Sequence, residues 1–166
     1  MQKLNHLIKE APGTFIFCFG SNHPASFAKL LGTSVPEFLS RSISSGLPGY
    51  GRVFVGTSPS WGNASFANII QHGKSEVEGY AVKLIPEEID KVDKSIGVPK
   101  LYKREKVKFK RLPFNDGDVM IEGEVYIVIE KGLLKQYKRP TTEYLEATCK
   151  TLSTSLYLRI GPYEDN

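Results

Sequence analysis

Cysteine and histidine are scarce in this chain. Of its 166 residues, two are cysteines and three are histidines. Cys18 lies in an apolar stretch and Cys149 in a predicted helix, so we interpret both as reduced core thiols and not as a disulfide framework. The histidines have no metal-ligand spacing with each other or with the cysteines, so we expect neither a metal site nor a cofactor. They are His6, His23 and His72.

Long hydrophobic runs and a strong charge of one sign are absent as well. No apolar run approaches the roughly 18 residues that a membrane-spanning helix needs. Residues 1–10 lack the apolar core of a secretory signal, so we expect a cytoplasmic protein without a membrane segment. The 22 Lys and Arg residues nearly balance the 18 Asp and Glu residues, for a net charge of +4. This balance disfavours nucleic acid as a partner.

The pattern of apolar and turn-forming residues predicts one mixed α/β domain with much antiparallel pairing. Residues 1–13 are expected to form an arm, 14–152 the domain and 153–166 a C-terminal extension. The apolar residues of that extension predict packing against another surface, which could belong to a second subunit, and the oligomeric state stays open. The expected strands are 15–19, 47–56, 64–71, 77–84, 102–112 and 119–130, and the expected helices are 24–31, 34–41, 86–96 and 141–152.

The first predicted strand ends in a glycine-containing loop. Its apolar run, 15–19, is typical of a strand that is buried on both faces, and Pro24 opens the next predicted helix. Gly20, Ser21 and Asn22 therefore lie between a strand and a helix N-terminus, where backbone N–H groups can bind an anion. The alternative is a plain turn in which glycine supplies a positive φ.

These residues resemble a known family. Phe19, Gly20, Ser21 and Asn22 look like the Tyr-Gly-Ser-Asn loop of the gamma-glutamylcyclotransferase family. Four later segments resemble family motifs in the same order and together span about residues 14–148. They are 61–67, 76–82, 92–104 and 139–145. The resemblance implies an AIG2-like fold, a small and mostly antiparallel β-barrel flanked by helices, with the loop at the mouth of a pocket.

The resemblance also implies a reaction of glutathione metabolism. In the family, the α-amine of a γ-glutamyl group attacks its own γ-carbonyl and 5-oxoproline is released. Such intramolecular acyl transfer needs an anchor for the substrate carboxylate, a base for the ammonium proton and donors for the oxyanion. By resemblance, substrate binding falls to the loop from Phe19 to Asn22 and to Tyr102, whose hydroxyl can donate a hydrogen bond.

The chain departs from the family at the catalytic base. Where the family has a glutamate directly before a Gly-Val pair, this chain has Ile96. Isoleucine cannot accept a proton, and a positioned base is worth roughly 10²–10⁴ in rate. Asp93 and His23 are conceivable substitutes, although a structural role for Asp93 and a surface position for His23 are the plainer interpretations. The catalytic residues therefore stay unassigned.

Two alternatives to a working cyclotransferase follow from the residues. One is a catalytically inactive domain, a pseudoenzyme that keeps the loop pocket and binds or senses a small carboxylate. The other is weak polyanion binding through the basic strand 100–111, which alternation arranges with most of its lysines on one face. The plainer interpretation of that strand is a solvated face whose lysines discourage edge-to-edge pairing.

Overall fold

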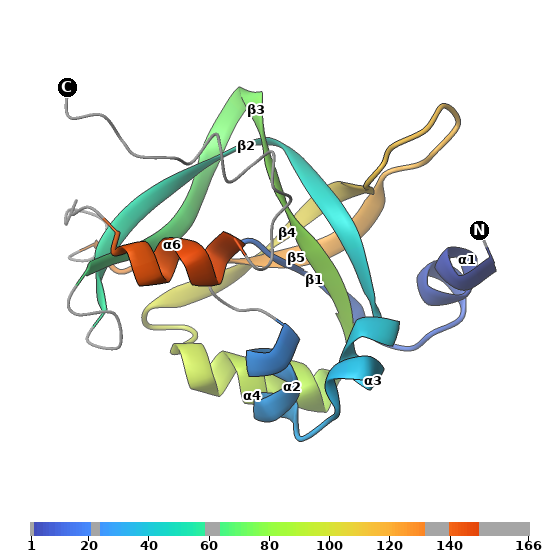
Figure 1. The fold of residues 1–166 in the computed structure, drawn as a ribbon, viewed down its shortest axis with the longest axis horizontal. Helices are drawn as coiled ribbons and strands as arrows, with labels where there is room; N and C mark the ends of the chain where they lie inside the picture. Colours follow the sequence, from blue (N-terminus) through green and yellow to red (C-terminus); the bar gives the residue numbers. More distant parts are fainter. Residues whose placement is uncertain (1, 21–23, 59–63, 132–139, 150–166) are drawn as a thin grey trace.

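The computed structural model describes residues 2–20, 24–58, 64–131 and 140–149, and its strands close into a barrel (Figure 1). Around the barrel the strand order is β1-β3-β2-β4-β5, and every pair is antiparallel except β1 with β5. This confirms the predicted mixed α/β architecture. The elements are α1 (Gln2–Lys9), β1 (Thr14–Cys18), α2 (Pro24–Leu31), α3 (Val35–Ser40), β2 (Ser42–Ser58), β3 (Ala64–Leu84), α4 (Pro86–Ile96), β4 (Tyr102–Arg111), β5 (Ile121–Val128) and α6 (Thr142–Cys149).

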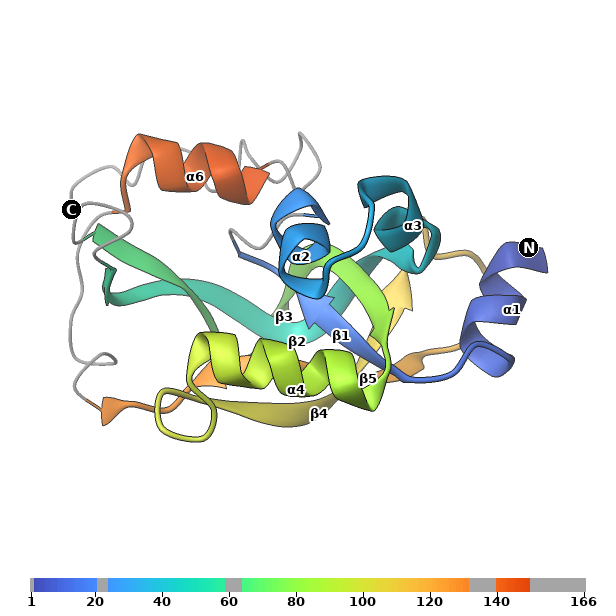
Figure 2. The same ribbon diagram turned by 90° about the horizontal axis from the view of Figure 1, so that it is seen from below.

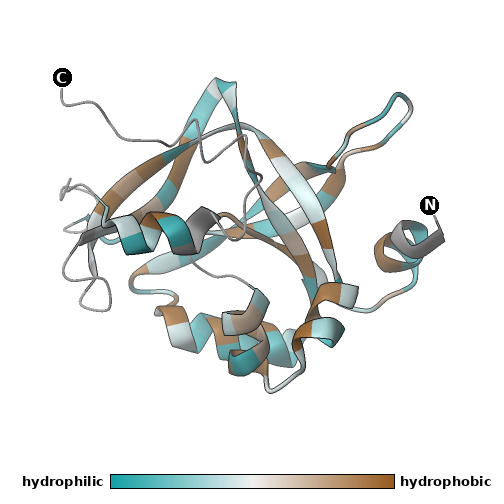
Figure 3. Ribbon diagram, viewed as in Figure 1, coloured by the Kyte–Doolittle hydropathy of each residue, from teal (hydrophilic) through white to brown (hydrophobic). Residues whose placement is uncertain are grey.

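Strand β1 is buried on both faces, as its apolar run predicts. Phe15 and Phe17 point into the barrel interior, because successive side chains of a strand alternate between its faces. Ile16 and Cys18 point outward into a second hydrophobic cluster, between the barrel and its helices. Figure 3 shows the same alternation of hydrophobic and hydrophilic residues along the longer strands. β1 therefore belongs to both cores at once.

Strands β2 and β3 form one long hairpin, which corrects the prediction for residues 64–84. We expected two strands with a turn at 72–75, but β3 runs without interruption from Ala64 to Leu84. Its register against β2 shifts at the expected turn, since Pro48 pairs with Glu76 and Tyr50 pairs with Gln71. The additional residues are taken up as an irregularity of the strand, where the Ser75 hydroxyl and His72 Nδ1 lie 2.7 Å apart.

Helices α2, α3 and α4 gather on one side of the barrel, where the outer cluster lies (Figure 2). The predicted limits of α4 are confirmed: Pro86 opens the helix and Gly97 ends it with a φ of +89°. Arg41, which follows α3, lies 2.8 Å from a Glu88 carboxylate oxygen and joins the two helices. Within the described ranges, none of the helices has both the length and the apolar character that crossing a membrane requires.

The N-terminal arm contains a helix that was not predicted. α1 lies at the end of the barrel opposite α6 (Figures 1 and 2). Leu7 is buried in the interior cluster, and the Lys83 ammonium donates hydrogen bonds to the carbonyls of Leu7 and Ile8 at 2.6 and 3.3 Å. At the other end of the chain, the predicted helix 141–152 is α6, while residues 150–152 and the extension 153–166 lie outside the described residues.

Candidate functional site

The predicted binding loop is described only at its beginning. Phe19 and Gly20 follow β1, whereas Ser21, Asn22 and His23 lie outside the described residues. Phe19 is buried within the interior cluster. The candidate site therefore consists of described residues that surround Phe19 and Gly20.

Arg52 fixes the backbone where the loop begins. From β2, its guanidinium Nη2 donates to the carbonyl of Phe19 at 2.8 Å and to the carbonyl of Glu78 at 3.0 Å. One side chain thus ties the end of β1 to the middle of β3. Hydrogen bonds from a charged donor are the stronger kind, so this contact holds the start of the loop in place.

Gly20 lies beside the hydroxyl of Tyr144. A Cβ built on Gly20 would lie 3.4 Å from that oxygen and 3.7 Å from the Cβ of Ala67. Gly20 is not among the glycines with positive φ, so the alternative in which it serves a left-handed turn is wrong. Gly20 is therefore close to α6 and β3, and a methyl group at this position would contact both.

Tyr144 lies next to Gly20, and Tyr102, which packs against the outer cluster together with Ile96, is close enough to Tyr144 to interact with its charge. The Tyr144 hydroxyl accepts a hydrogen bond from the backbone N–H of Ala67 at 2.6 Å. Burial, and secondly the proximity of Tyr144, raises the pKa of Tyr102 to about 12. Tyr102 therefore keeps its proton at neutral pH and can donate a hydrogen bond. Phe54 and Phe66 flank the pair, with ring centroids 6.4 Å from Tyr144 and Tyr102 respectively.

We refer to these residues together as the barrel mouth. Sequence reasoning included Phe19, Gly20 and Tyr102 but assigned no role to Tyr144 or Arg52. The sequence could have pointed to both residues. Tyr144 lies in one of the segments that resemble the family, and Arg52 is the one charged residue of the predicted strand 47–56. The barrel mouth consists of Phe19, Gly20, Arg52, Phe54, Phe66, Ala67, Tyr102 and Tyr144.

Ile96 and Asp93 lie on α4, and neither offers a free carboxylate. Ile96 is the last residue of the helix, half-buried, and packs against the outer cluster. Asp93 Oδ1 accepts a hydrogen bond of 2.6 Å from the Tyr126 hydroxyl and lies 3.3 Å from Arg104 Nε. Arg104 in turn bonds Glu124 at 2.6 Å. These contacts favour the structural interpretation of Asp93 over the role of a substitute base.

The basic strand is largely neutralised by its neighbours. Among the described residues, most basic side chains of β4 lie within 4.0 Å of a carboxylate oxygen. The pairs are Lys103–Glu105, Arg104–Glu124, Lys108–Glu122, Lys110–Glu76 and Arg111–Asp118. A nucleic acid would have to compete with these carboxylates for each cation, which disfavours the polyanion hypothesis.

Metal chemistry finds no support in the part of the chain that the structure describes. Within residues 2–20, 24–58, 64–131 and 140–149, no three His, Cys, Asp or Glu side chains are grouped so as to hold a metal ion. The Cys18 thiol is buried, and burial raises its pKa to about 12, so it is not a reactive thiolate.

Comparison with solved structures identifies the fold. A structure described as gamma-glutamyl cyclotransferase matches with a TM-score of 0.65 and 19% identity over 92% of this chain and 89% of that one. YkqA from Bacillus subtilis matches with a TM-score of 0.67 and 19% identity over 95% of this chain and 56% of that longer one. A yeast gamma-glutamyl cyclotransferase specific to glutathione matches with a TM-score of 0.55 and 12% identity over 93% of this chain and 90% of that one.

At these identities the likeness concerns the fold. No protein-family model and no curated protein matches the sequence. The chain has the gamma-glutamyl cyclotransferase fold, as the resemblance of its motifs implies.

Proposed function

We propose that this protein binds small γ-glutamyl compounds at the barrel mouth and releases 5-oxoproline slowly or not at all. The proposal rests chiefly on two residues of α4. The side chain of Ile96 cannot accept a proton, and the Asp93 carboxylate is already bonded to Tyr126 and Arg104. The fold supports the choice of ligand, because structural neighbours of this chain are described as gamma-glutamyl cyclotransferases.

The chemistry of cyclisation explains why a missing base matters. The substrate α-amine forms a bond to its own γ-carbonyl carbon, and the bond from that carbon to the departing amine breaks. The attacking amine must first lose a proton, and a positioned base is worth roughly 10²–10⁴ in rate. Tyr102 is neutral and can orient a carbonyl by donating a hydrogen bond, but it is too weak a base to take this proton.

Calorimetric titration with two isomers tests binding. γ-Glutamylalanine and α-glutamylalanine have the same composition and charge and differ only in which carboxyl group carries the amide. The proposal predicts heat of binding with the γ isomer and much weaker binding of the α isomer. Absence of heat with γ-glutamylalanine at millimolar concentration, or equal binding of both isomers, contradicts it.

Replacing Gly20 tests where the ligand binds. In Gly20→Ala the new methyl group would make ordinary contacts with Tyr144 and Ala67, so the fold should persist while the space at the mouth is filled. We expect affinity for γ-glutamylalanine to fall about tenfold, which corresponds to ~1.4 kcal/mol. Gly73→Ala is the matched control, because its Cβ would meet no atom within 4 Å. Unchanged affinity in Gly20→Ala would move the site elsewhere.

Restoring a carboxylate tests why turnover is slow. Ile96→Glu should raise the rate of 5-oxoproline formation, by up to roughly 10²–10⁴ if the carboxylate is correctly positioned. Ser95→Glu adds the same group one residue earlier, at an exposed position of α4, and should leave the rate unchanged. Rapid turnover by the unaltered protein would show that it has another base, and the second half of the proposal would be wrong.

A further inference from the structure

A groove lies beside α1, at the end of the barrel opposite α6. The groove has a volume of about 830 Å³, and its lining includes Ile8 of α1 and residues of β1, β4 and β5. α6, the helix that contains Tyr144, lies at the other end of the barrel (Figures 1 and 2). The groove lies beside the start of the ladder between β1 and β5. Their ladder pairs Ile16 with Glu124 and Phe17 with Val125, and the lining includes residues that precede these pairs on both strands.

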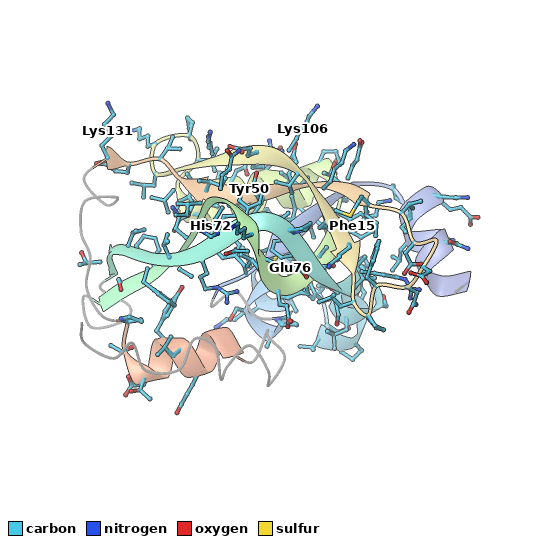
Figure 4. The ribbon with its side chains drawn as sticks, turned by 90° about the horizontal axis from the view of Figure 1, so that it is seen from above. Phe15, Tyr50, His72, Glu76, Lys106 and Lys131 are labelled. Atoms are coloured by element: carbon cyan, nitrogen blue, oxygen red, sulfur yellow. The ribbon has the colours of Figure 1, made fainter. Side chains whose placement is uncertain are left out.

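Part of the groove is apolar. Phe15, Val107 and Ile121 are buried side chains of the interior cluster, and the partly exposed Met120 extends the apolar lining. Figure 4 shows Phe15 toward the α1 end of the barrel. Gly123 allows β1 to approach closely, because a Cβ at this position would lie 2.7 Å from the Phe15 carbonyl oxygen. This surface can accept a hydrocarbon group.

Lys83 adds a buried cation to this lining. Its side chain belongs to a residue that is only 7% exposed, and its ammonium lies 5.0 Å from the centre of the Phe15 ring. The ammonium donates to the carbonyls of Leu7 and Ile8, but no carboxylate of the described residues lies within 4.0 Å of it. Burial lowers the pKa of Lys83. The charge is held in place and is not neutralised by a neighbouring acid.

The other charges that line the groove leave a positive surplus. Glu124 is bonded to Arg104, and the exposed Glu122 lies 4.0 Å from Lys108. Lys106 projects away from the barrel at the rim (Figure 4), and no carboxylate of the described residues lies within ion-pairing distance of it. The groove therefore presents a buried cation, a second cation at its rim and an apolar surface between β1, β4 and β5.

We propose that this groove binds a small molecule in which a carboxylate is attached to an apolar chain or ring. The carboxylate accepts a hydrogen bond from Lys83, since an ammonium has three N–H donors and two are used by α1. The apolar part lies on Phe15, Val107 and Ile121. This ligand site is separate from the barrel mouth and does not depend on the function proposed there.

Three probes of equal chain length test the proposal. Octanoate, 1-octanol and octylammonium are straight chains with the same total number of carbons, and they carry a negative, neutral and positive head group. A charge-assisted hydrogen bond predicts that octanoate binds about tenfold to a hundredfold more tightly than the alcohol, with the amine weakest. Binding is measured by calorimetry and by protein NMR, which also shows whether residues of the groove are the ones perturbed. Equal affinities, or no binding of octanoate at millimolar concentration, overturn the proposal.

Two sets of variants locate the carboxylate. Lys83→Met should weaken octanoate binding about tenfold or more and leave octanol binding nearly unchanged. Because Lys83 also holds α1, the exposed Met120 provides a second test: Met120→Glu places a negative charge at the groove and should abolish the preference for octanoate, whereas Met120→Gln should keep it. Octanoate binding that survives both Lys83→Met and Met120→Glu overturns the assignment. Gly20→Ala, at the barrel mouth, should not alter it.

Discussion

Single residues of α4 and of the barrel mouth differ in whether their side chains are already bonded within the protein. The carboxylate of Asp93 is bonded to a tyrosine on β5 and faces an arginine on β4, so it joins three elements instead of awaiting a substrate. Burial is the main cause that raises the pKa of Tyr126, and the hydrogen bond with the Asp93 carboxylate raises it further. Tyr102, by contrast, keeps a proton that burial makes costly to lose. Asp93 is therefore a structural acid, whereas Tyr102 is a candidate hydrogen-bond donor to a ligand.

The raised pKa of Tyr102 predicts an alkaline loss of stability. The folded protein retains a proton on Tyr102 up to about pH 12, whereas the unfolded chain releases it near the ordinary tyrosine pKa of 10.0, so stability falls as pH rises from 10 toward 12. At pH 11.5 this residue should account for a loss of roughly 2 kcal/mol. Urea unfolding at pH 9 and pH 11.5 should show a smaller alkaline loss in Tyr102→Phe than in the unaltered protein. Equal losses contradict the assignment.

At the scale of elements, α6 is a short helix that is joined to the barrel through Tyr144. Thr141 Oγ1 accepts a hydrogen bond from the Tyr144 backbone N–H at 3.1 Å and starts the helix. The Tyr144 hydroxyl then joins α6 to β3 through Ala67, and its ring packs edge-on against Phe54 of β2. A helix of this length is marginal alone, so these contacts keep α6 over the barrel mouth.

Removing that hydroxyl should loosen α6. Tyr144→Phe keeps the ring but leaves the buried N–H of Ala67 without its acceptor, which costs about 1–3 kcal/mol. We expect a lower free energy of unfolding and faster amide hydrogen exchange in 142–149. Tyr50→Phe is the control, because the Tyr50 hydroxyl bonds to Glu105 of β4 at 3.4 Å and to Gln71 of β3, and neither partner belongs to α6. Unaltered exchange in α6 would show that other contacts hold the helix.

Elements set by local pattern were predictable, and those set by distant contacts were not. The apolar run of β1 and the Pro86 and Gly97 boundaries of α4 suffice for their prediction. Residues 72–75 look like a turn locally, but β3 pairs with β2 on either side of them and continues through them. The position of α1 depends on Lys83, which lies far along the chain. At the barrel mouth, the resemblance pointed to Phe19, Gly20 and Tyr102 as candidates, and their role in binding stays a prediction. The partners of Asp93, Arg52 and Tyr144 could not be predicted, because each comes from an element distant in sequence.

At the scale of the whole molecule, two hydrophobic clusters share the same strands. The barrel interior contains Phe109, and the outer cluster contains Phe38 of α3; both side chains are fully buried. β1 contributes alternate residues to each cluster, and β3 does the same, with Ala81 inside and Val82 outside. Neither cluster can lose its packing without exposing side chains of strands that the other requires. This arrangement favours unfolding of the barrel and its helices as one unit.

One substitution in each cluster tests whether the barrel and its helices unfold as one unit. Phe109→Ala and Phe38→Ala should each lower the free energy of unfolding by about 3–5 kcal/mol. Both variants should keep a single transition that far-UV circular dichroism and hydrogen exchange report alike, since the shared strands transmit the loss from one cluster to the other. Early opening of α2 and α3 alone in Phe38→Ala, with the barrel amides still protected, would instead show that the helices form a separate unit. Such a result would also mean that the outer cluster against which Ile96 packs can open while the barrel stays folded. The interpretation of Ile96 as a fixed apolar residue beside the site would then have to change.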